Sequence, residues 1–258
     1  SQLAGIFGVV GACVILILME PDMGTAMIFV PMTLIMMYIG GVPLKTIGTL
    51  IGIGLSIIAF VLGMLFLPDK LGMNPETQAK ILKVVGVKPY HKDRIMVYLS
   101  PGSDLRGAGW NKRQSQIAVG SGGVFGKGFK QGTQNILGFL PKTVAPTDFI
   151  YSVIAEETGF LGSIVILFLF GVLVTCGART ALIARDKMGR LLCAGFTAMI
   201  FSHVFINMAM TVGLMPITGL PLPLISYGGS FTILTMSGLG MVQSVYIRSS
   251  SDEVALYE

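Results

Sequence analysis

Long runs without a charged residue constrain this chain most. A helix needs about 20 apolar residues to cross the hydrocarbon of a bilayer. Six runs approach that length: Leu3–Met19, Met23–Val42, Thr46–Leu67, Phe160–Ala178, Leu191–Val212 and Phe231–Ile247. Only 12% of the residues are charged and the mean hydropathy is +0.78, whereas a soluble domain carries roughly 25% charged residues. We therefore predict an all-α integral membrane protein, a polytopic helical bundle with six spans.

The charges in the short loops set the expected orientation. Basic residues of short loops stay on the cytoplasmic side, and those of this chain fall on one side of the six runs: Lys45, Arg179, Arg185, Lys187, Arg190 and Arg248. The opposite side then carries Glu20-Pro21-Asp22 and the Gly- and Pro-rich segment Gly213–Gly229. That segment cannot be one helix, so we expect a re-entrant loop there, with a cytoplasmic tail at 249–258.

A long basic loop separates the first three spans (1–67) from the last three (148–248). Residues 68–147 hold twelve Lys and Arg against four acids, a net charge of +8. Long loops cross membranes largely regardless of charge, so we place this one outside. Hydrophobic residues at 81–85 between lysines predict an interfacial amphipathic helix, and a second helix is expected from about Arg113 to Val119. The charge indicates either a solvated surface near lipid headgroups or a binding surface for an anionic substrate.

A glycine-rich stretch inside the loop resembles a phosphate loop only superficially. Gly120–Gly128 lacks the Gly-Lys-Ser/Thr ending of a nucleotide-binding loop, so we exclude nucleotide binding. Its backbone amides, with Lys127 and Lys130, could still hold a phosphate. The alternative is a flexible turn.

Three carboxylates stand where the loop enters the fourth span, at Asp148, Glu156 and Glu157. Apolar surroundings disfavour a charged acid, so such residues either serve a function or have a local structural role. Asp148 could cap the helix, and the glutamates could pair with a loop arginine. On a helix, Glu156 would lie about 12 Å beyond Asp148 near the same face.

The remaining polar candidates are few. Ser226 and Tyr227 bring hydroxyl groups to the Gly/Pro segment 219–230, which could equally be a structural turn. The three cysteines lie in apolar runs and form no metal-binding spacing. We interpret them as packing residues.

Four separated motifs give the chain a specific resemblance. Glu20–Ala26, Gln114–Gly123, Thr147–Phe160 and Gly219–Ser230 resemble, in the same order, the motifs of the SEDS family of bacterial cell-wall polymerases, the RodA and FtsW group. Gly126-Lys127-Gly128, Gly132-Thr133-Gln134 and Met215–Gly219 are more similar to the RodA branch. The family fold has ten spans, so the resemblance implies that this chain holds the last six and the large outer loop.

The resemblance implies a glycosyltransferase of the cytoplasmic membrane that polymerises lipid II, during elongation in the RodA branch. It places the family's essential acid at Asp148, as a general base or ligand of Mg or Mn. It also implies a class B penicillin-binding protein and other membrane proteins of the elongation machinery as partners, with undecaprenyl-linked glycan as product and no role for nucleic acid.

Further site residues follow from charge and position within that reading. Arg94, Lys127 and Lys130 are candidate contacts to the substrate pyrophosphate, with Lys112 and Arg113 behind them. Gln134, Ser226 and Tyr227 are candidates for the groove lining. Lys142 and Ala145-Pro146 depart from the family pattern, which changes the expected loop charge but not Asp148.

Two alternatives remain at this point. A lipid II flippase would need polar groups deep along a path through the spans, and a scaffold for the wall machinery would need no catalytic acid. The apolar spans and the crowding of polar groups on one side favour chemistry at the outer face.

Overall fold

The computed structural model describes residues 2–20, 22–70, 96–98 and 107–254, and all regular elements there are helices. In chain order these are α1 (Gln2–Met19), α2 (Met23–Ile39), α3 (Leu44–Lys70), α6 (Ala108–Ser121), α7 (Thr133–Ile136), α8 (Ile150–Ile183), α9 (Lys187–Val212) and α10 (Gly229–Val254). The expected amphipathic segment at 81–85 lies outside the described residues, whereas α6 covers the helix expected around Arg113 to Val119.

The apolar composition makes several of these helices candidates for membrane spans. Four of them, α3, α8, α9 and α10, are long and apolar enough to cross a bilayer, and α1 and α2 contain shorter apolar segments. The helical membrane fold is therefore confirmed, while the count of six spans stays a prediction. Local residues fix some helix starts, because the carboxylates of Asp22 and Asp186 accept backbone N–H groups of α2 and α9.

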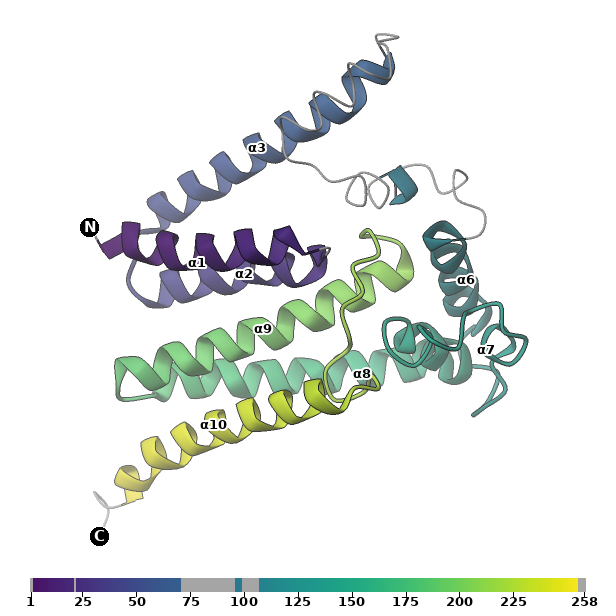
Figure 1. Ribbon diagram of the computed structural model, residues 1–258. Helices are drawn as coiled ribbons and strands as arrows, with labels where there is room; N and C mark the ends of the chain where they lie inside the picture. The colour runs from purple at the N-terminus through teal and green to yellow at the C-terminus, as the bar shows by residue number, and fades with distance from the viewer. Residues whose placement is uncertain (1, 21, 71–95, 99–106, 255–258) are drawn as a thin grey trace.

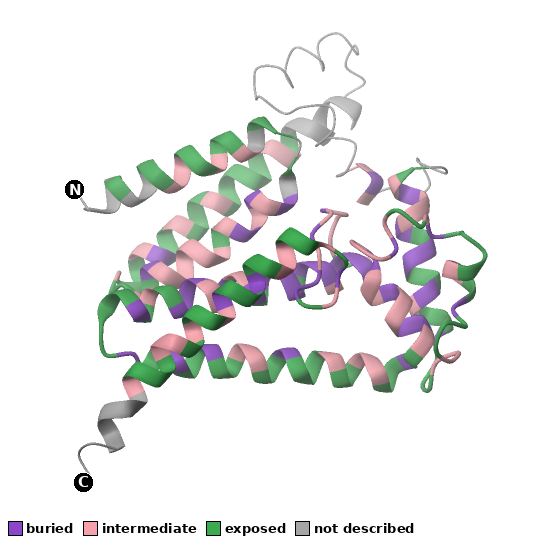
Figure 2. Ribbon diagram, turned by 60° about the horizontal axis from the view of Figure 1, so that its bottom comes forward, coloured by how far each residue is buried: buried purple, intermediate pink, exposed green. Residues whose placement is uncertain are grey.

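Helix α9 forms the centre of the bundle. It packs against α2, α8 and α10. In its most apolar stretch 56% of the residues are buried, against 6% in that of α3. The buried residues, coloured purple in Figure 2, gather toward the interior of the bundle. Small residues permit the close approach of the helices. A methyl group added at Gly195 of α9 would lie 2.9 Å from the Met36 sulfur of α2, and one at Gly238 of α10 would collide with the Phe196 ring.

The two ends of the bundle differ in chemistry. Figure 1 shows the α2–α3 turn, the α8–α9 turn and the end of α10 together at one end, where the predicted cytoplasmic residues Lys45, Arg185 and Arg248 lie. Helices α6 and α7 and the segment 213–228 gather toward the other end. There α6 docks on the bundle through the Ser115 hydroxyl, which lies 2.7 Å from the Ser152 hydroxyl and donates to the Thr211 carbonyl.

Candidate active site at the start of helix α8

Asp148 lies in a hydrogen-bonded turn that leads into α8. Its backbone N–H donates to the Val144 carbonyl at 3.0 Å, and its side chain is half-buried. The helix begins only at Ile150, and its N-cap position is Phe149, with no capping bond from a side chain. The N-cap position is therefore not Asp148, as one interpretation of the sequence expected, because α8 begins one residue later than a cap at Asp148 requires.

Three successive carbonyls hold this turn in place. The Pro146 oxygen accepts from the Tyr227 N–H at 2.9 Å, and the Thr147 oxygen from the Ser226 hydroxyl at 2.6 Å. The Asp148 oxygen accepts from the Asn207 side-chain amide at 2.9 Å. The backbone around Asp148 is therefore fixed by α9 and the segment 213–228, both distant in sequence.

Asn207 is the residue of this site that the sequence interpretation missed. It is fully buried, and its amide nitrogen also donates to the Leu220 carbonyl at 2.6 Å. Its side chain thus joins the Asp148 turn to the Gly/Pro segment. A lone amide in a charge-free span is the signal that could have revealed it, because a polar side chain there needs a hydrogen-bonding partner.

The Gly/Pro segment also shapes the surroundings of the Asp148 carboxylate. Gly219 has a φ of 76°, and a methyl group added there would lie 3.5 Å from Asp148 Oδ2. Glycine adopts this left-handed conformation at no steric cost. The glycine thus lets the segment pass close to the carboxylate without a side chain against it.

Ser226 and Tyr227, both candidates for the groove lining, lie in different surroundings. Ser226 is only 6% exposed, and its hydroxyl both donates to Thr147 and accepts from the Leu222 N–H. Its bonds are committed to the backbone, so it positions the Asp148 turn. Tyr227 is 79% exposed, and its backbone rather than its hydroxyl contributes to the three-carbonyl contact.

Glu156 forms a separate buried cluster, six residues after the first residue of α8. It is 0% exposed, and its carboxylate lies 2.6 Å from the Lys127 ammonium. The Thr133 hydroxyl donates to it at 2.8 Å and the Gln134 N–H at 3.2 Å. The expected partner was a loop arginine, but the structure pairs Glu156 with a lysine from the glycine-rich loop.

The glycine-rich loop supplies backbone hydrogen-bonding partners where α8 is interrupted at Gly159. Gly159 has φ 69° and ψ −162°, which removes the helical bonds between the N–H groups of Phe160 and Leu161 and the carbonyls of Glu156 and Glu157. Those N–H groups instead donate to the carbonyls of Gly123 and Val124. The two freed carbonyls accept from the N–H groups of Lys127 and Gly128, both at 3.0 Å.

This exchange overturns two earlier expectations about the loop. The amides at 127 and 128 serve α8, so they do not form a phosphate cradle. The Lys127 charge faces a fully buried acid, so it is engaged in an ion pair and not available as a pyrophosphate contact. The loop is a structural insert that replaces two broken helix bonds, not a flexible turn.

Substitution of Gly159 tests this helix break. Only glycine readily adopts the backbone conformation of Gly159. Any other residue in this conformation costs about 1–3 kcal/mol. An added methyl group would also collide with the Gly126 nitrogen. We expect Gly159→Ala to lower the free energy of unfolding by about 3 kcal/mol or more. Gly171→Ala is the matched control, since Gly171 lies in the same helix with nothing within 4 Å of an added methyl.

Thermal unfolding of the detergent-solubilised variants measures the difference. Gly171→Ala is expected to be neutral or stabilising by up to about 1 kcal/mol, because alanine favours helix. Equal melting of the two variants would show that the break at Gly159 is not required.

The other predicted site residues are dispersed. Arg94 lies outside the described residues. Lys130 is exposed, with its ammonium 5.5 Å from the Phe129 ring centre. Lys112 is buried against Tyr98, and this burial lowers the pKa of its ammonium. Glu157 is half-buried and Arg113 exposed.

The Gln134 side chain adds an unusual feature near Glu156. Its Oε1 atom is buried and has no hydrogen-bonding partner among the described residues. Gln134 therefore meets the Glu156 cluster through its backbone, rather than presenting its amide to an open groove.

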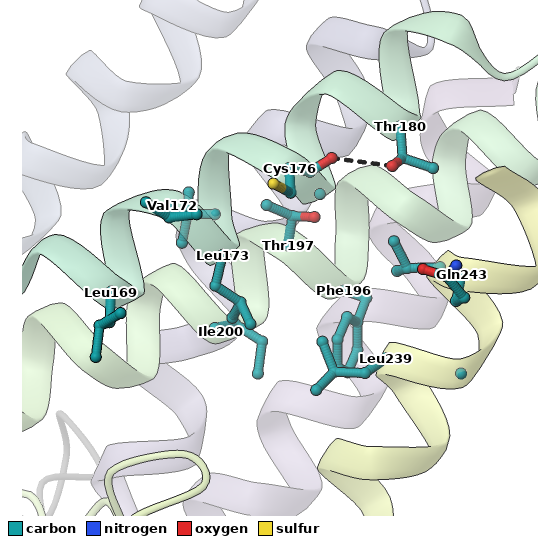
Figure 3. Close-up of a pocket in the computed structure, with 14 residues that line it drawn as sticks. Leu169, Val172, Leu173, Cys176, Thr180, Phe196, Thr197, Ile200, Leu239 and Gln243 are labelled. Carbon is teal, nitrogen blue, oxygen red and sulfur yellow. Dashed lines mark hydrogen bonds between the residues drawn. The ribbon is translucent and has the colours of Figure 1, made fainter. Parts of the chain in front are cut away.

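A cavity of about 530 Å³ lies between α8, α9 and α10, away from both acids (Figure 3). Apolar side chains such as Leu173, Phe196 and Leu239 line it, and none of its lining residues is charged. The Thr180 hydroxyl near it donates to the Cys176 carbonyl. This composition suits packing or a lipid chain, not acid–base chemistry.

Comparisons with known proteins agree with the membrane-helix architecture. The family model of cell cycle proteins named for FtsW, RodA and SpoVE matches residues 2–251. The peptidoglycan glycosyltransferase MrdB of Escherichia coli K12 is 37% identical over 90% of this chain, and the stage V sporulation protein E of Bacillus subtilis is 36% identical over 92%. The chain spans 56% and 58% of the lengths of these two relatives.

Solved structures give the same result. A chain from a peptidoglycan synthase complex that coordinates polymerization and crosslinking superposes with a TM-score of 0.67 at 29% identity, covering 95% of this chain and 60% of that one. A mutant of the rod shape determining protein RodA of Thermus thermophilus gives a TM-score of 0.54 at 25% identity, covering 95% and 55%. The matches support one common fold.

Proposed function

The chain belongs to the FtsW, RodA and SpoVE family, and from this premise we propose that the full-length protein polymerises lipid II into glycan strands at the outer face of the bacterial cytoplasmic membrane. Relatives named peptidoglycan glycosyltransferases support the reaction class. The observation that carries the proposal is the Asp148 turn, fixed by three hydrogen bonds to its backbone carbonyls at the end of the bundle opposite Lys45, Arg185 and Arg248.

The Asp148 carboxylate acts as general base in this proposal. A sugar hydroxyl of the acceptor attacks the anomeric carbon of the donor, and a new C–O bond forms while the bond to the lipid pyrophosphate breaks. The hydroxyl proton passes to Asp148, because a carboxylate within hydrogen-bond reach can accept it in the transition state. The leaving group departs as undecaprenyl pyrophosphate, whose charge needs nearby cations.

Charge at the outer face supports binding of that pyrophosphate. With Lys127 paired to Glu156, we assign the pyrophosphate contacts to Arg94 and Lys130. Lys130 is exposed, so its ammonium is accessible to a substrate.

A divalent cation fits this site only together with the substrate. The described residues contain no group of three or more His, Cys, Asp or Glu that could hold a metal. Mg²⁺ commonly takes one or two carboxylates plus substrate phosphates, so Asp148 and the pyrophosphate would be its ligands. When bound, the ion would neutralise charge on the leaving group.

The proposed partner is a class B penicillin-binding protein, which would crosslink the strands. The similarity to a chain of a complex that coordinates polymerization and crosslinking supports such a pairing. Other membrane proteins of the elongation machinery are expected to associate with it.

One experiment separates this function from the flippase and scaffold alternatives. Purified full-length protein in detergent receives fluorescent lipid II, and the products are separated by size. A polymerase yields glycan strands without any membrane. A flippase yields none in detergent but moves lipid II across vesicles, and a scaffold does neither.

A further inference from the structure

A rigid loop beside α8 exposes two phenylalanine rings. We call residues Gly123–Lys130 the aromatic loop. Within it, Phe125 is 81% exposed and Phe129 is 79% exposed. Burying a phenylalanine is worth about 1.5–3 kcal/mol, so two exposed rings in one short loop indicate an interaction surface.

The loop cannot fold these rings away. Its backbone exchanges four hydrogen bonds with α8 around Gly159, as described above. Gly126 and Gly128 hold positive φ angles of 80° and 105°, and an added methyl group at Gly126 would collide with the Glu157 carbonyl. The backbone that carries both rings is therefore held by the helix to which the loop is bound.

The position of the loop along α8 fixes its depth. The loop bonds to Phe160 and Leu161, and exposed apolar residues of α8 begin at the same point and continue through Val165 and Phe168. From Phe160 to Ala178 the helix is about 28 Å long, which matches the hydrocarbon thickness of about 30 Å. The aromatic loop thus lies level with the start of the apolar stretch of α8, which is where we place the outer hydrocarbon boundary.

The charge pattern of the loop suits that boundary. Lys127 is neutralised by Glu156, which leaves Lys130 as the exposed cation, placed over the Phe129 ring. Aromatic rings at the headgroup level with a lysine reaching outward are typical of interfacial anchors. A lipid surface satisfies both features, because it offers acyl chains to the rings and phosphate groups to the ammonium.

We propose that the aromatic loop inserts into the outer leaflet, with Phe125 and Phe129 at the boundary of headgroups and acyl chains. Lys130 then lies at the level of the headgroup phosphates, which is also the level of the pyrophosphate of a lipid-linked substrate. The chain continues from this loop into α7 and the turn that carries Asp148, and the Leu140 N–H bonds back to the Gln134 carbonyl. Because α8 both holds this loop and begins directly after the Asp148 turn, the depth of the inserted loop indicates the height of Asp148 relative to lipid phosphates, a consequence that rests on the proposed function.

Depth-resolved quenching tests the insertion without requiring activity. The full-length protein is reconstituted into phospholipid nanodiscs, with Phe125→Trp as the probe and the unsubstituted protein as background. Phe168→Trp is the matched control, since Phe168 is an exposed phenylalanine about 12 Å further along α8. Lipids brominated near the headgroup should remove most of the emission added at 125, whereas deeply brominated lipids should quench the emission added at 168.

Two results would overturn the proposal. One is emission at 125 that bromine quenches at no depth and aqueous iodide quenches freely, while the 168 control behaves as expected. The other is emission at 125 that only an added partner protein shields, which would assign the surface to that protein. Polymerisation is scored separately, so a failed insertion and a failed polymerase function are distinguishable.

Discussion

Glu156→Ala is expected to lower the free energy of unfolding by about 3–5 kcal/mol, because it leaves the Lys127 ammonium beside a buried space without its counter-charge. Glu156 is fully buried and receives bonds from Lys127, Thr133 and the Gln134 backbone. Its loss should release the aromatic loop from α8. Thermal unfolding and protease cleavage of the loop measure the two effects.

The neighbouring acid provides the matched control. Glu157→Gln removes the same charge one residue away, at a half-buried side chain, and should change stability by less than about 0.5 kcal/mol. The double variant Glu156→Gln with Lys127→Met should be less destabilised than the sum of its single variants, since neither charge is left without its partner. If Glu156→Ala melts like Glu157→Gln, the ion pair does not hold the loop.

Asp148→Asn should leave the fold intact and remove activity. The N-cap position of α8 is Phe149, and the three bonds that fix the Asp148 turn use backbone carbonyls of residues 146–148. Asparagine keeps the shape of the side chain, so the free energy of unfolding should change by less than about 1 kcal/mol. Its neutral amide cannot take a proton from the acceptor hydroxyl, so the chemical step should stop.

The sequence predicted the parts of this fold that depend on local composition. Charge-free runs gave the long helices, and Gly- and Pro-rich residues marked the non-helical segment between α9 and α10. Three acids stood out at the entrance to a span, because apolar surroundings make a charge costly there, and the family resemblance singled out Asp148 among them. The helix caps at Asp22 and Asp186 follow the same local rules, although they were not predicted.

The sequence could not predict bonds between distant segments. Asn207 lies 59 residues from Asp148, and Ser226 lies 79 residues from Thr147. Lys127 and Glu156 are separated by 29 residues, and no periodicity relates a loop lysine to a helix acid. Gly159 resembled an ordinary residue of an apolar helix, because its role appears only when the glycine-rich loop is placed beside it.

Glycan formation from lipid II tests the central claim most directly. Purified full-length protein and its Asp148→Asn variant, matched for melting temperature and concentration, are given the same lipid II in detergent. We predict glycan strands from the unsubstituted protein and none from the variant. Near-normal strand formation by the Asp148→Asn variant would contradict the assignment of Asp148 as the base.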